Sequence, residues 1–172
     1  MCLLHMLESP FKHLMEFVDG CKIKWTATKG ELGTKIKGLN ENLTPLVNFT
    51  PIATDVPQVE SSIFSEASNR VRLHELCNAI SIGRDHVQEK FENKRYPVIN
   101  TLRWLTTSER VCGLYIREEQ PSDALKTMVE FTSQAYAPTH FDVFLNPGFE
   151  NASFHYLNYI KRSKVKFIYF LI

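Results

Sequence analysis

The chain has 172 residues, of which 44% are hydrophobic and 23% are charged, as in an ordinary folded domain. Lysine and arginine number 20 against 19 aspartate and glutamate residues, so the net charge of +1 creates no overall field that would attract nucleic acid or an acidic membrane. Any such binding has to come from a local patch. No apolar run approaches the roughly 20 residues that span a bilayer, so we expect no membrane partner.

Cysteine usage and the amino terminus indicate an intracellular protein. The first residues, "MCLLHMLESPFKHL", lack the basic start of a signal peptide, and polar residues interrupt their apolar run. The four cysteines form no C-x-x-C pair, and we expect them to be reduced thiols. They are Cys2, Cys21, Cys77 and Cys112.

Residues 1–20 form the first predicted unit, a helix that carries a C-x-x-H motif. Ser9 suits an N-cap, Pro10 the first helical position and Gly20 the stop. The residues before Ser9 are also predicted to be helical, with a break or kink at Ser9–Pro10. Apolar residues at i, i+3, i+4 and i+7 predict one buried face, made of Phe11, Leu14, Met15 and Val18.

Residues 21–66 are predicted to be a long loop, basic at first and then punctuated by proline, with one short helix around Glu31–Gly38. Such a length inside a compact domain suggests function, disorder or a missing packing partner. Between Lys22 and Gly38, five lysines stand against one acid, Glu31: they are Lys22, Lys24, Lys29, Lys35 and Lys37. With the interleaved Trp25 they could contact phosphates and stack on a base, or they could form a solvated loop.

Residues 67–163 are predicted to be helical. The first helix spans Ala67–Ile82 and ends at Gly83. Its buried stripe is predicted to contain Val71, His74, Cys77 and Ile80, widened by Leu73 and Leu76. A polar connector, "RDHVQEKFENKRY", follows over residues 84–96.

Three more helices are predicted in this region. The first spans Leu102–Arg117, with a common side formed by Leu105, Cys112, Tyr115 and Ile116. The second starts at the N-cap Ser122 and ends at Pro138, with a periodic face formed by Leu125, Met128, Val129, Thr132 and Tyr136. The third spans Asn151–Ser163, with an inward face formed by Ala152, Tyr156, Leu157 and Ile160.

The last nine residues, 164–172, form an atypical apolar tail, "KVKFIYFLI". The alternation at its start suits a strand, but no partner strand is visible in the sequence. We interpret this ending as a truncation or a different coding end. The predicted fold class is mainly α, with little or no β-sheet.

The sequence gives only weak support for a metal site or for nucleophilic catalysis. Cys2 with His5 and His74 with Cys77 have ligand-like spacings that could together hold zinc, but the two pairs stand about 70 residues apart. Cys77 also fits a buried helix face, where a free thiol behaves as a small apolar residue. The chain contains neither a G-x-S-x-G elbow nor a P-loop, so we predict no metal and no cofactor.

The pair Arg103–Trp104, in "NTLRWLTTSER", has two interpretations. As structure, Trp104 opens a helix and buries its ring, while Arg103 pairs with an acid such as Glu109. As function, an indole beside a guanidinium can stack on an extruded base and hold the adjoining phosphate.

Five segments resemble uncharacterised proteins derived from DNA transposons, which are in turn similar to the hAT transposases. They occur in the order "CLLHMLESPFKHLMEFVDG", "RLHELCNAISIG", "RWLTTSERVCGLYI", "PSDALKTMVEFTSQAYAPTHF" and "NPGFENASFHYL". The resemblance implies part of an RNase H-like core together with its helical insertion. It also implies that Cys2 and His5 match the C-x-x-H motif of that family. Arg103 and Trp104 match its Arg-Trp pair, whose tryptophan stacks on a flipped base.

The same resemblance implies an internal fragment without the segments that carry the catalytic carboxylates, and therefore no two-metal chemistry. We expect a catalytically inactive, nuclear transposase-like remnant with weak residual DNA binding. The candidate DNA-binding residues are Arg103, Trp104, His5, Lys22, Lys24, Trp25, Lys35 and Lys37. The alternatives are a helical protein-interaction module that self-associates through exposed apolar faces, or a metal-dependent enzyme that uses the four cysteine and histidine residues named above.

Overall fold

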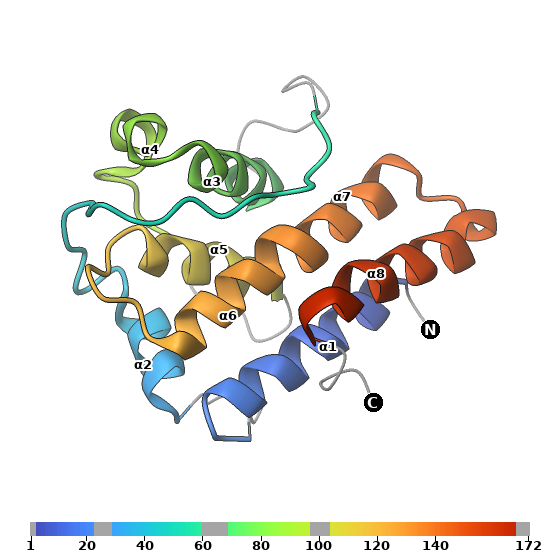
Figure 1. Cartoon of the computed structure of the whole chain (residues 1–172), viewed down its shortest axis with the longest axis horizontal. Helices are drawn as coiled ribbons and strands as arrows, with labels where there is room; N and C mark the ends of the chain where they lie inside the picture. The colour runs from blue at the N-terminus through green and yellow to red at the C-terminus, as the bar shows by residue number, and fades with distance from the viewer. Residues whose placement is uncertain (1–2, 23–28, 60–68, 97–103, 168–172) are drawn as a thin grey trace.

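The computed structural model describes residues 3–22, 29–59, 69–96 and 104–167 (Figure 1). Within these ranges the chain forms helices and no strand, which confirms the mainly-α prediction. None of the helices found in these ranges combines the length and the apolar character that crossing a membrane requires. In chain order the elements are α1 (Leu3–Val18), α2 (Glu31–Gly38), α3 (Asn69–Ile82), α4 (Arg84–Phe91), α5 (Trp104–Tyr115), α6 (Asp123–Phe131), η2 (Thr132–Tyr136), α7 (Ala137–Leu145), η3 (Phe149–Asn151) and α8 (Ala152–Phe167).

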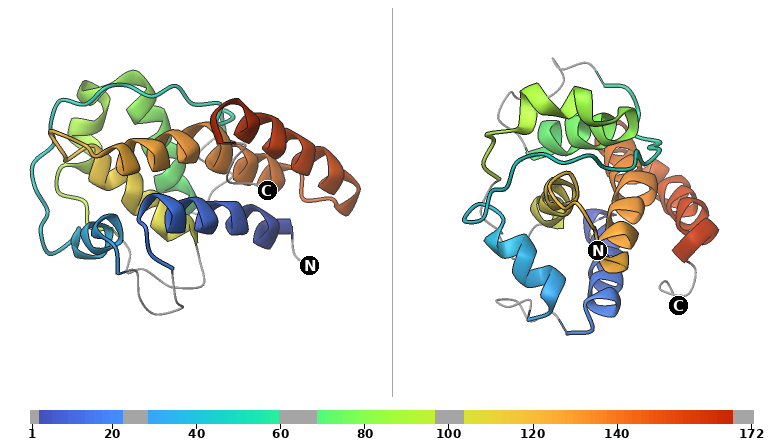
Figure 2. Two further views of the ribbon diagram at one scale, coloured as in Figure 1. Left: turned by 60° about the horizontal axis from the view of Figure 1, so that its bottom comes forward. Right: turned by 60° about the vertical axis from the view of Figure 1, so that its left-hand side comes forward.

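Helix α5 is the centre of the fold. All its residues from Leu105 to Tyr115 are buried, polar ones included, because helices α1, α2, α3 and α6 contact it from different sides (Figure 2). Residues 94–96 lie close to this helix. A side chain at Gly113 would collide with the ring of Tyr96, which explains why glycine suits a position inside a helix here.

Helix α1 differs from its prediction at the start. It runs without interruption from Leu3 to Val18 with Pro10 inside, so Ser9 is not an N-cap. Proline has no N–H to donate, and α1 therefore lacks one backbone hydrogen bond at Pro10. The predicted buried face is confirmed: Phe11, Leu14 and Met15 are buried, and Val18 packs against the core.

The short helix predicted in the basic loop is confirmed as α2. The Asp19 carboxylate accepts hydrogen bonds from the backbone amides of Leu32 and Gly33, at 2.8 and 3.1 Å. At the other end the Arg110 guanidinium donates to the carbonyls of Ile36 and Lys37, at 2.8 and 3.0 Å. An anion at the amino end and a cation at the carboxyl end both favour the helix dipole, and they hold α2 between α1 and α5.

Residues 43–59, which we call the strap, form an extended segment along the helices (Figure 1). The Val47 amide donates to the Ile116 carbonyl and the Ile52 amide to the Ile80 carbonyl, at 3.1 and 3.3 Å. The side chains of Leu46, Ile52 and Val56, which belong to the strap, are buried. The long predicted loop is therefore a packed element whose backbone groups are held by distant helices, as a buried connection requires.

The connector predicted over residues 84–96 is partly wrong, because Arg84–Phe91 forms α4. Its buried residues Val87 and Phe91 stand at i and i+4, but the intervening charged residues conceal this spacing in the sequence. Gly83 separates α3 from α4 with a φ of +122°, a conformation that glycine tolerates and other residues rarely adopt.

Pro138 was predicted to end a helix. Instead, it lies inside a continuous helical run. The predicted N-cap Ser122 is confirmed, since its hydroxyl accepts from the Leu125 amide at 3.2 Å. After α6 the chain makes the π-helical turn η2 and continues as α7. The Ala137 amide donates to the Thr132 carbonyl, and Pro138 has no amide hydrogen.

The π-turn explains a contact with the strap. Because Ala137 donates one residue further back than in an α-helix and Pro138 cannot donate, the Ser133 carbonyl lacks a helical donor. The Thr54 hydroxyl of the strap donates to this carbonyl at 2.8 Å. The helix irregularity thus supplies an anchoring point for the strap.

Helix α8 is present, but its predicted inward face is wrong. Tyr156 and Leu157 are 44% and 55% exposed, whereas His155, Tyr159 and Ser163 are buried. Polar contacts to α7 and its end fix this orientation: His155 Nε2 lies 3.0 Å from the Asn146 carbonyl oxygen, and Arg162 Nη1 lies 2.6 Å from Asp142 Oδ2. Residues 164–167 of the supposed strand-like tail belong to α8, and residues 168–172 lie outside the described residues.

Candidate functional site

Trp104 begins α5 and its side chain is half-buried. Its ring centroid lies 5.6 Å from that of Phe11 in α1, with the ring planes inclined by 46°. This contact attaches the indole to the core, as the structural interpretation of the Arg-Trp pair expects. A half-buried indole also keeps part of its surface at the solvent. Arg103 lies outside the described residues.

The other sequence-predicted site residues are only partly described. Lys22 follows α1 and is exposed, and Lys35 and Lys37 are exposed on α2. Lys24 and Trp25 lie outside the described residues, and His5 belongs to α1 through its backbone, its side chain lying outside the description. Lys35 and Lys37 are therefore on α2, and Trp104 is on the neighbouring helix α5. The two helices meet at Arg110, ~9 Å along the α5 axis from Trp104.

The electrostatic surroundings of α2 limit how it can meet an anion. Asp19 already occupies the amides of the first turn, where a phosphate would otherwise bind. Lys35 lies 3.2 Å from Glu118 and 3.8 Å from Glu31, so part of its charge is matched. Phosphate contacts on α2 would thus be made by lysine ammonium groups at the last turn.

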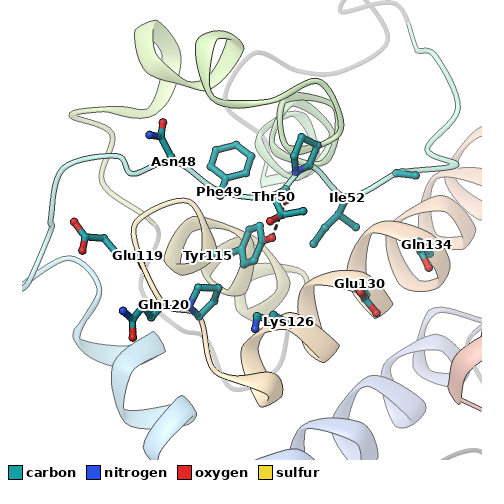
Figure 3. Close-up of a pocket in the computed structure, with 13 residues that line it drawn as sticks. Asn48, Phe49, Thr50, Ile52, Tyr115, Glu119, Gln120, Lys126, Glu130 and Gln134 are labelled. Atoms are coloured by element: carbon teal, nitrogen blue, oxygen red, sulfur yellow. Dashed lines mark hydrogen bonds between the residues drawn. The ribbon is translucent and has the colours of Figure 1, made fainter.

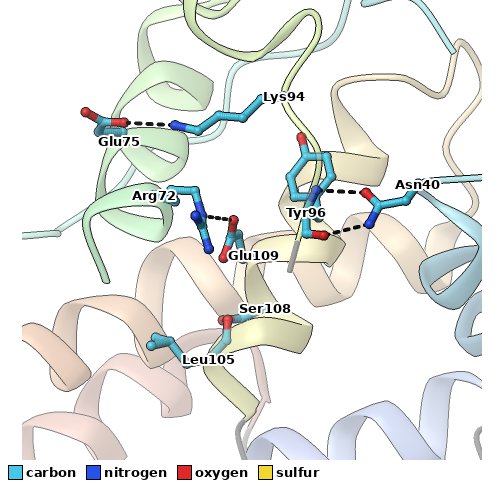
Figure 4. A network of polar contacts seen from close by, with 8 residues as sticks. All are labelled: Asn40, Arg72, Glu75, Lys94, Tyr96, Leu105, Ser108 and Glu109. Carbon is cyan, nitrogen blue, oxygen red and sulfur yellow. Dashed lines mark hydrogen bonds and ion pairs between the residues drawn. The ribbon is translucent and has the colours of Figure 1, made fainter. Parts of the chain in front are cut away.

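A buried polar network lies between α3 and α5 (Figure 4). Arg72 Nε approaches Glu109 Oε1 at 2.6 Å, and Glu109 is fully buried. Glu109, considered as a partner for Arg103, is therefore paired with Arg72. Burial raises the pKa of Glu109 to about 7, although the positive charge of Arg72 acts in the opposite direction. Its second oxygen, Oε2, has no hydrogen-bond partner among the residues that the structure describes. Such a carboxyl group can take up a proton near neutral pH.

The same network holds residues 94–96, the segment that approaches Gly113 of α5. Asn40 and Tyr96 exchange two hydrogen bonds, from the Tyr96 amide at 2.8 Å and to the Tyr96 carbonyl at 2.6 Å. Lys94 Nζ lies 3.9 Å from Glu75 Oε2. Burial is the main cause that raises the pKa of Tyr96 to about 12, so its phenol stays protonated. These contacts fasten residues 94–96 to α3 and to the end of α2 (Figure 4).

The spaced pair His74 and Cys77 takes part in protein contacts. His74 Nε2 lies 2.9 Å from the Pro57 carbonyl oxygen of the strap. Cys77 is buried against Cys112, and the hydrogen bond between the two thiols, together with burial, raises the pKa of Cys112 well above its usual range. Among the residues that the structure describes, no three histidine, cysteine or acidic side chains form a group able to hold a metal ion. Cys2 lies outside them.

Sequence reasoning missed a groove beside the strap (Figure 3). It has a volume of about 640 Å³ and lies between strap residues 48–53 and the segment that leads from α5 into α6. The sequence predicted only a long loop here, punctuated by Pro45, Pro51 and Pro57, and no groove. The groove arises because the strap crosses helices that are distant in the sequence. Local sequence patterns cannot predict such a crossing.

No family model, curated protein or solved structure matches this chain. The resemblance to hAT transposases therefore stays a prediction. What the described residues contribute is a half-buried indole on α5, exposed lysines on α2, and a polar groove on the strap side.

Proposed function

We propose that this chain is a catalytically inactive, transposase-like helical remnant that binds DNA weakly. The observation that carries the proposal is the position of Trp104, which begins α5, packs against Phe11 and is only half-buried. The motifs that resemble those of the hAT transposases do not match the segments that carry that family's catalytic carboxylates, so no catalytic step is assigned. A nuclear location would follow from DNA binding.

A fixed indole suits base stacking. The Phe11 contact holds the ring before a ligand arrives, so little side-chain entropy is lost when a base stacks on the remaining surface. Stacking of one base on an aromatic side chain contributes about 1–3 kcal/mol and tolerates any base sequence. Arg103 is adjacent in the sequence and would hold the neighbouring phosphate.

The charge distribution explains why the binding would be weak. The exposed lysines Lys22, Lys35 and Lys37 can each contact a phosphate, but Glu31 and Glu118 match part of the charge of Lys35. With a net charge of only +1, long-range attraction adds little. We therefore expect binding to single-stranded DNA that disappears as salt increases.

The experiment is a titration of the protein with labelled single-stranded DNA, followed by fluorescence anisotropy. Trp104→Leu keeps an apolar side chain against Phe11 but removes the stacking surface, and we expect affinity to fall about fivefold or more. Trp104→Phe retains an aromatic face and is the matched control, with a smaller loss. Equal affinities for wild type and Trp104→Leu, with both folded by circular dichroism, would exclude the stacking role.

A second function, a helical module for protein interaction, is favoured by the outer face of α8. Phe154 and Leu157 stand at i and i+3 and are 62% and 55% exposed, and Tyr156 is 44% exposed. Neighbouring exposed apolar side chains are typical of association surfaces. Sedimentation velocity over a concentration series tests this function: self-association that Leu157→Lys abolishes supports it, and a monomer at every concentration argues against it.

A further inference from the structure

The groove beside the strap combines an aromatic floor with carboxylates. Phe49 of the strap and Tyr115 of α5 have ring centroids 5.8 Å apart and ring planes inclined by 57°. The Tyr115 hydroxyl donates to the Thr50 carbonyl at 2.8 Å, which fixes the ring (Figure 3). Aromatic faces held in this way attract cations through their negative quadrupole.

Two carboxylates flank this aromatic pair. Figure 3 shows Glu119 and Glu130 on either side of Tyr115, Glu119 exposed and Glu130 half-buried. The pKa of Tyr115 is raised by burial and then by the negative charge of Glu130, so the field of this carboxylate reaches the phenol. The groove also contains one ammonium group, Lys126, whose Nζ lies 3.6 Å from Asp123 Oδ1. Among the described residues that line the groove, two carboxylates thus stand against one ammonium group, which favours a positively charged ligand.

The strap also offers backbone groups. Within the described residues, the amides of Phe49, Thr50 and Ala53 donate to no protein acceptor. An extended peptide that lies along an extended segment can accept such hydrogen bonds, and pockets then recognise its side chains. The volume of about 640 Å³ lies in the range of sites that enclose a ligand of a few residues.

We propose that this groove binds an extended peptide segment through a lysine or arginine side chain. The cation lies against the accessible part of the Phe49 ring, which packs on the buried Tyr115 ring, between Glu119 and Glu130, and the peptide backbone runs beside the strap. The proposal is independent of DNA binding, because it uses none of the residues assigned to DNA. Its ligand also carries the opposite charge.

The test is a titration of the ¹⁵N-labelled full chain with the peptide acetyl-Ala-Ala-Lys-Ala-Ala-amide, followed by NMR. We expect amide shifts confined to the strap and to the residues around Tyr115. The same peptide with Gln in place of Lys should produce no such shifts, because it lacks the charge. n-Butylammonium, which has the cation but no backbone, should bind more weakly than the lysine peptide.

Variants that keep the shape of the groove complete the test. Glu119→Gln should weaken peptide binding up to about fivefold, as for an exposed ion pair, and Glu130→Gln should weaken it more because this side chain is half-buried. Phe49→Leu should also weaken it, because an aliphatic side chain has no quadrupole. The matched control is Glu92→Gln, an exposed carboxylate outside the groove, which should change nothing.

Three outcomes would overturn the proposal. Equal binding of the lysine and glutamine peptides would exclude recognition of the charge. Equal binding of the peptide and n-butylammonium would exclude recognition of a polypeptide. Unchanged affinity in Glu119→Gln and Glu130→Gln, both shown to be folded by their NMR spectra, would place the binding elsewhere.

Discussion

At the scale of single residues, two buried ionisable groups make opposite contributions to the pH dependence of stability. Burial raises the pKa of Glu109 to about 7 from its usual 4.5. Burial, followed by the positive charge of Arg70, lowers the pKa of His140 to about 4 from its usual 6.5. Glu109 thus stabilises the fold below pH 4.5 and loses this contribution as the pH rises through 7. His140 stabilises it above pH 6.5 and loses this contribution as the pH falls through 4.

The two contributions change in opposite directions between pH 4.5 and 6.5, so they largely offset each other in the wild type. In Glu109→Gln only the His140 contribution remains. As the pH increases from 4.5 to 6.5, the free energy of unfolding of this variant should therefore rise by about 2 kcal/mol more than that of wild type. In His140→Phe it should fall by a similar amount. Urea denaturation at several pH values measures both, and profiles parallel to wild type would contradict the assignment.

Residue-scale features were only partly predictable. The sequence correctly placed Phe11 and Cys77 in the core, because apolar periodicity records which side of a helix is buried. It did not predict the buried Glu109, because a single acid in a helix is usually exposed. Its burial depends on Arg72, which comes from a helix 37 positions away in the chain.

At the scale of elements, packing between helices decided the outcomes that local patterns missed. Helix α8 turns His155 and Tyr159 inward because His155 meets the end of α7 and Tyr159 packs against Phe131 of α6, while the more apolar pair Tyr156–Leu157 faces out. The π-turn at Thr132–Tyr136 lets the helix pass Pro138, which a local rule treats as a stop. By contrast, α2 and the Ser122 cap follow local rules and were predicted correctly.

The close approach of Tyr96 to α5 gives a prediction at this scale. Gly113→Ala should destabilise the protein by about 1–3 kcal/mol, because the new methyl group collides with the buried Tyr96 ring, although alanine favours a helix. Gly38→Ala, at the end of α2, is the matched control and should change stability by less than about 1 kcal/mol, since only the Asn42 amide lies near. Thermal unfolding followed by circular dichroism measures both. Equal stability of the two variants would show that Tyr96 moves aside without cost.

At the scale of the whole molecule, composition and periodicity predicted a mainly helical protein, and the described residues confirm it. They could not predict the strap or its groove, since these depend on contacts such as Thr54 with Ser133, 79 positions apart. They also could not position Trp104 relative to Phe11, 93 positions away, although both residues had been singled out. Local propensity is recorded in a short window of sequence, whereas a site is formed by segments that meet only in the fold.

The central claim is weak, electrostatically assisted DNA binding, and the most direct measurement is the salt dependence of affinity for single-stranded DNA. If Lys22, Lys35, Lys37 and Arg103 each neutralise one phosphate, the logarithm of the association constant should fall against the logarithm of salt concentration with a slope of about −3. Substituting the three lysines by glutamine should leave a slope of about −0.7, the contribution of Arg103. An unchanged slope in that variant, or no detectable binding by the wild type at low salt, would contradict the account.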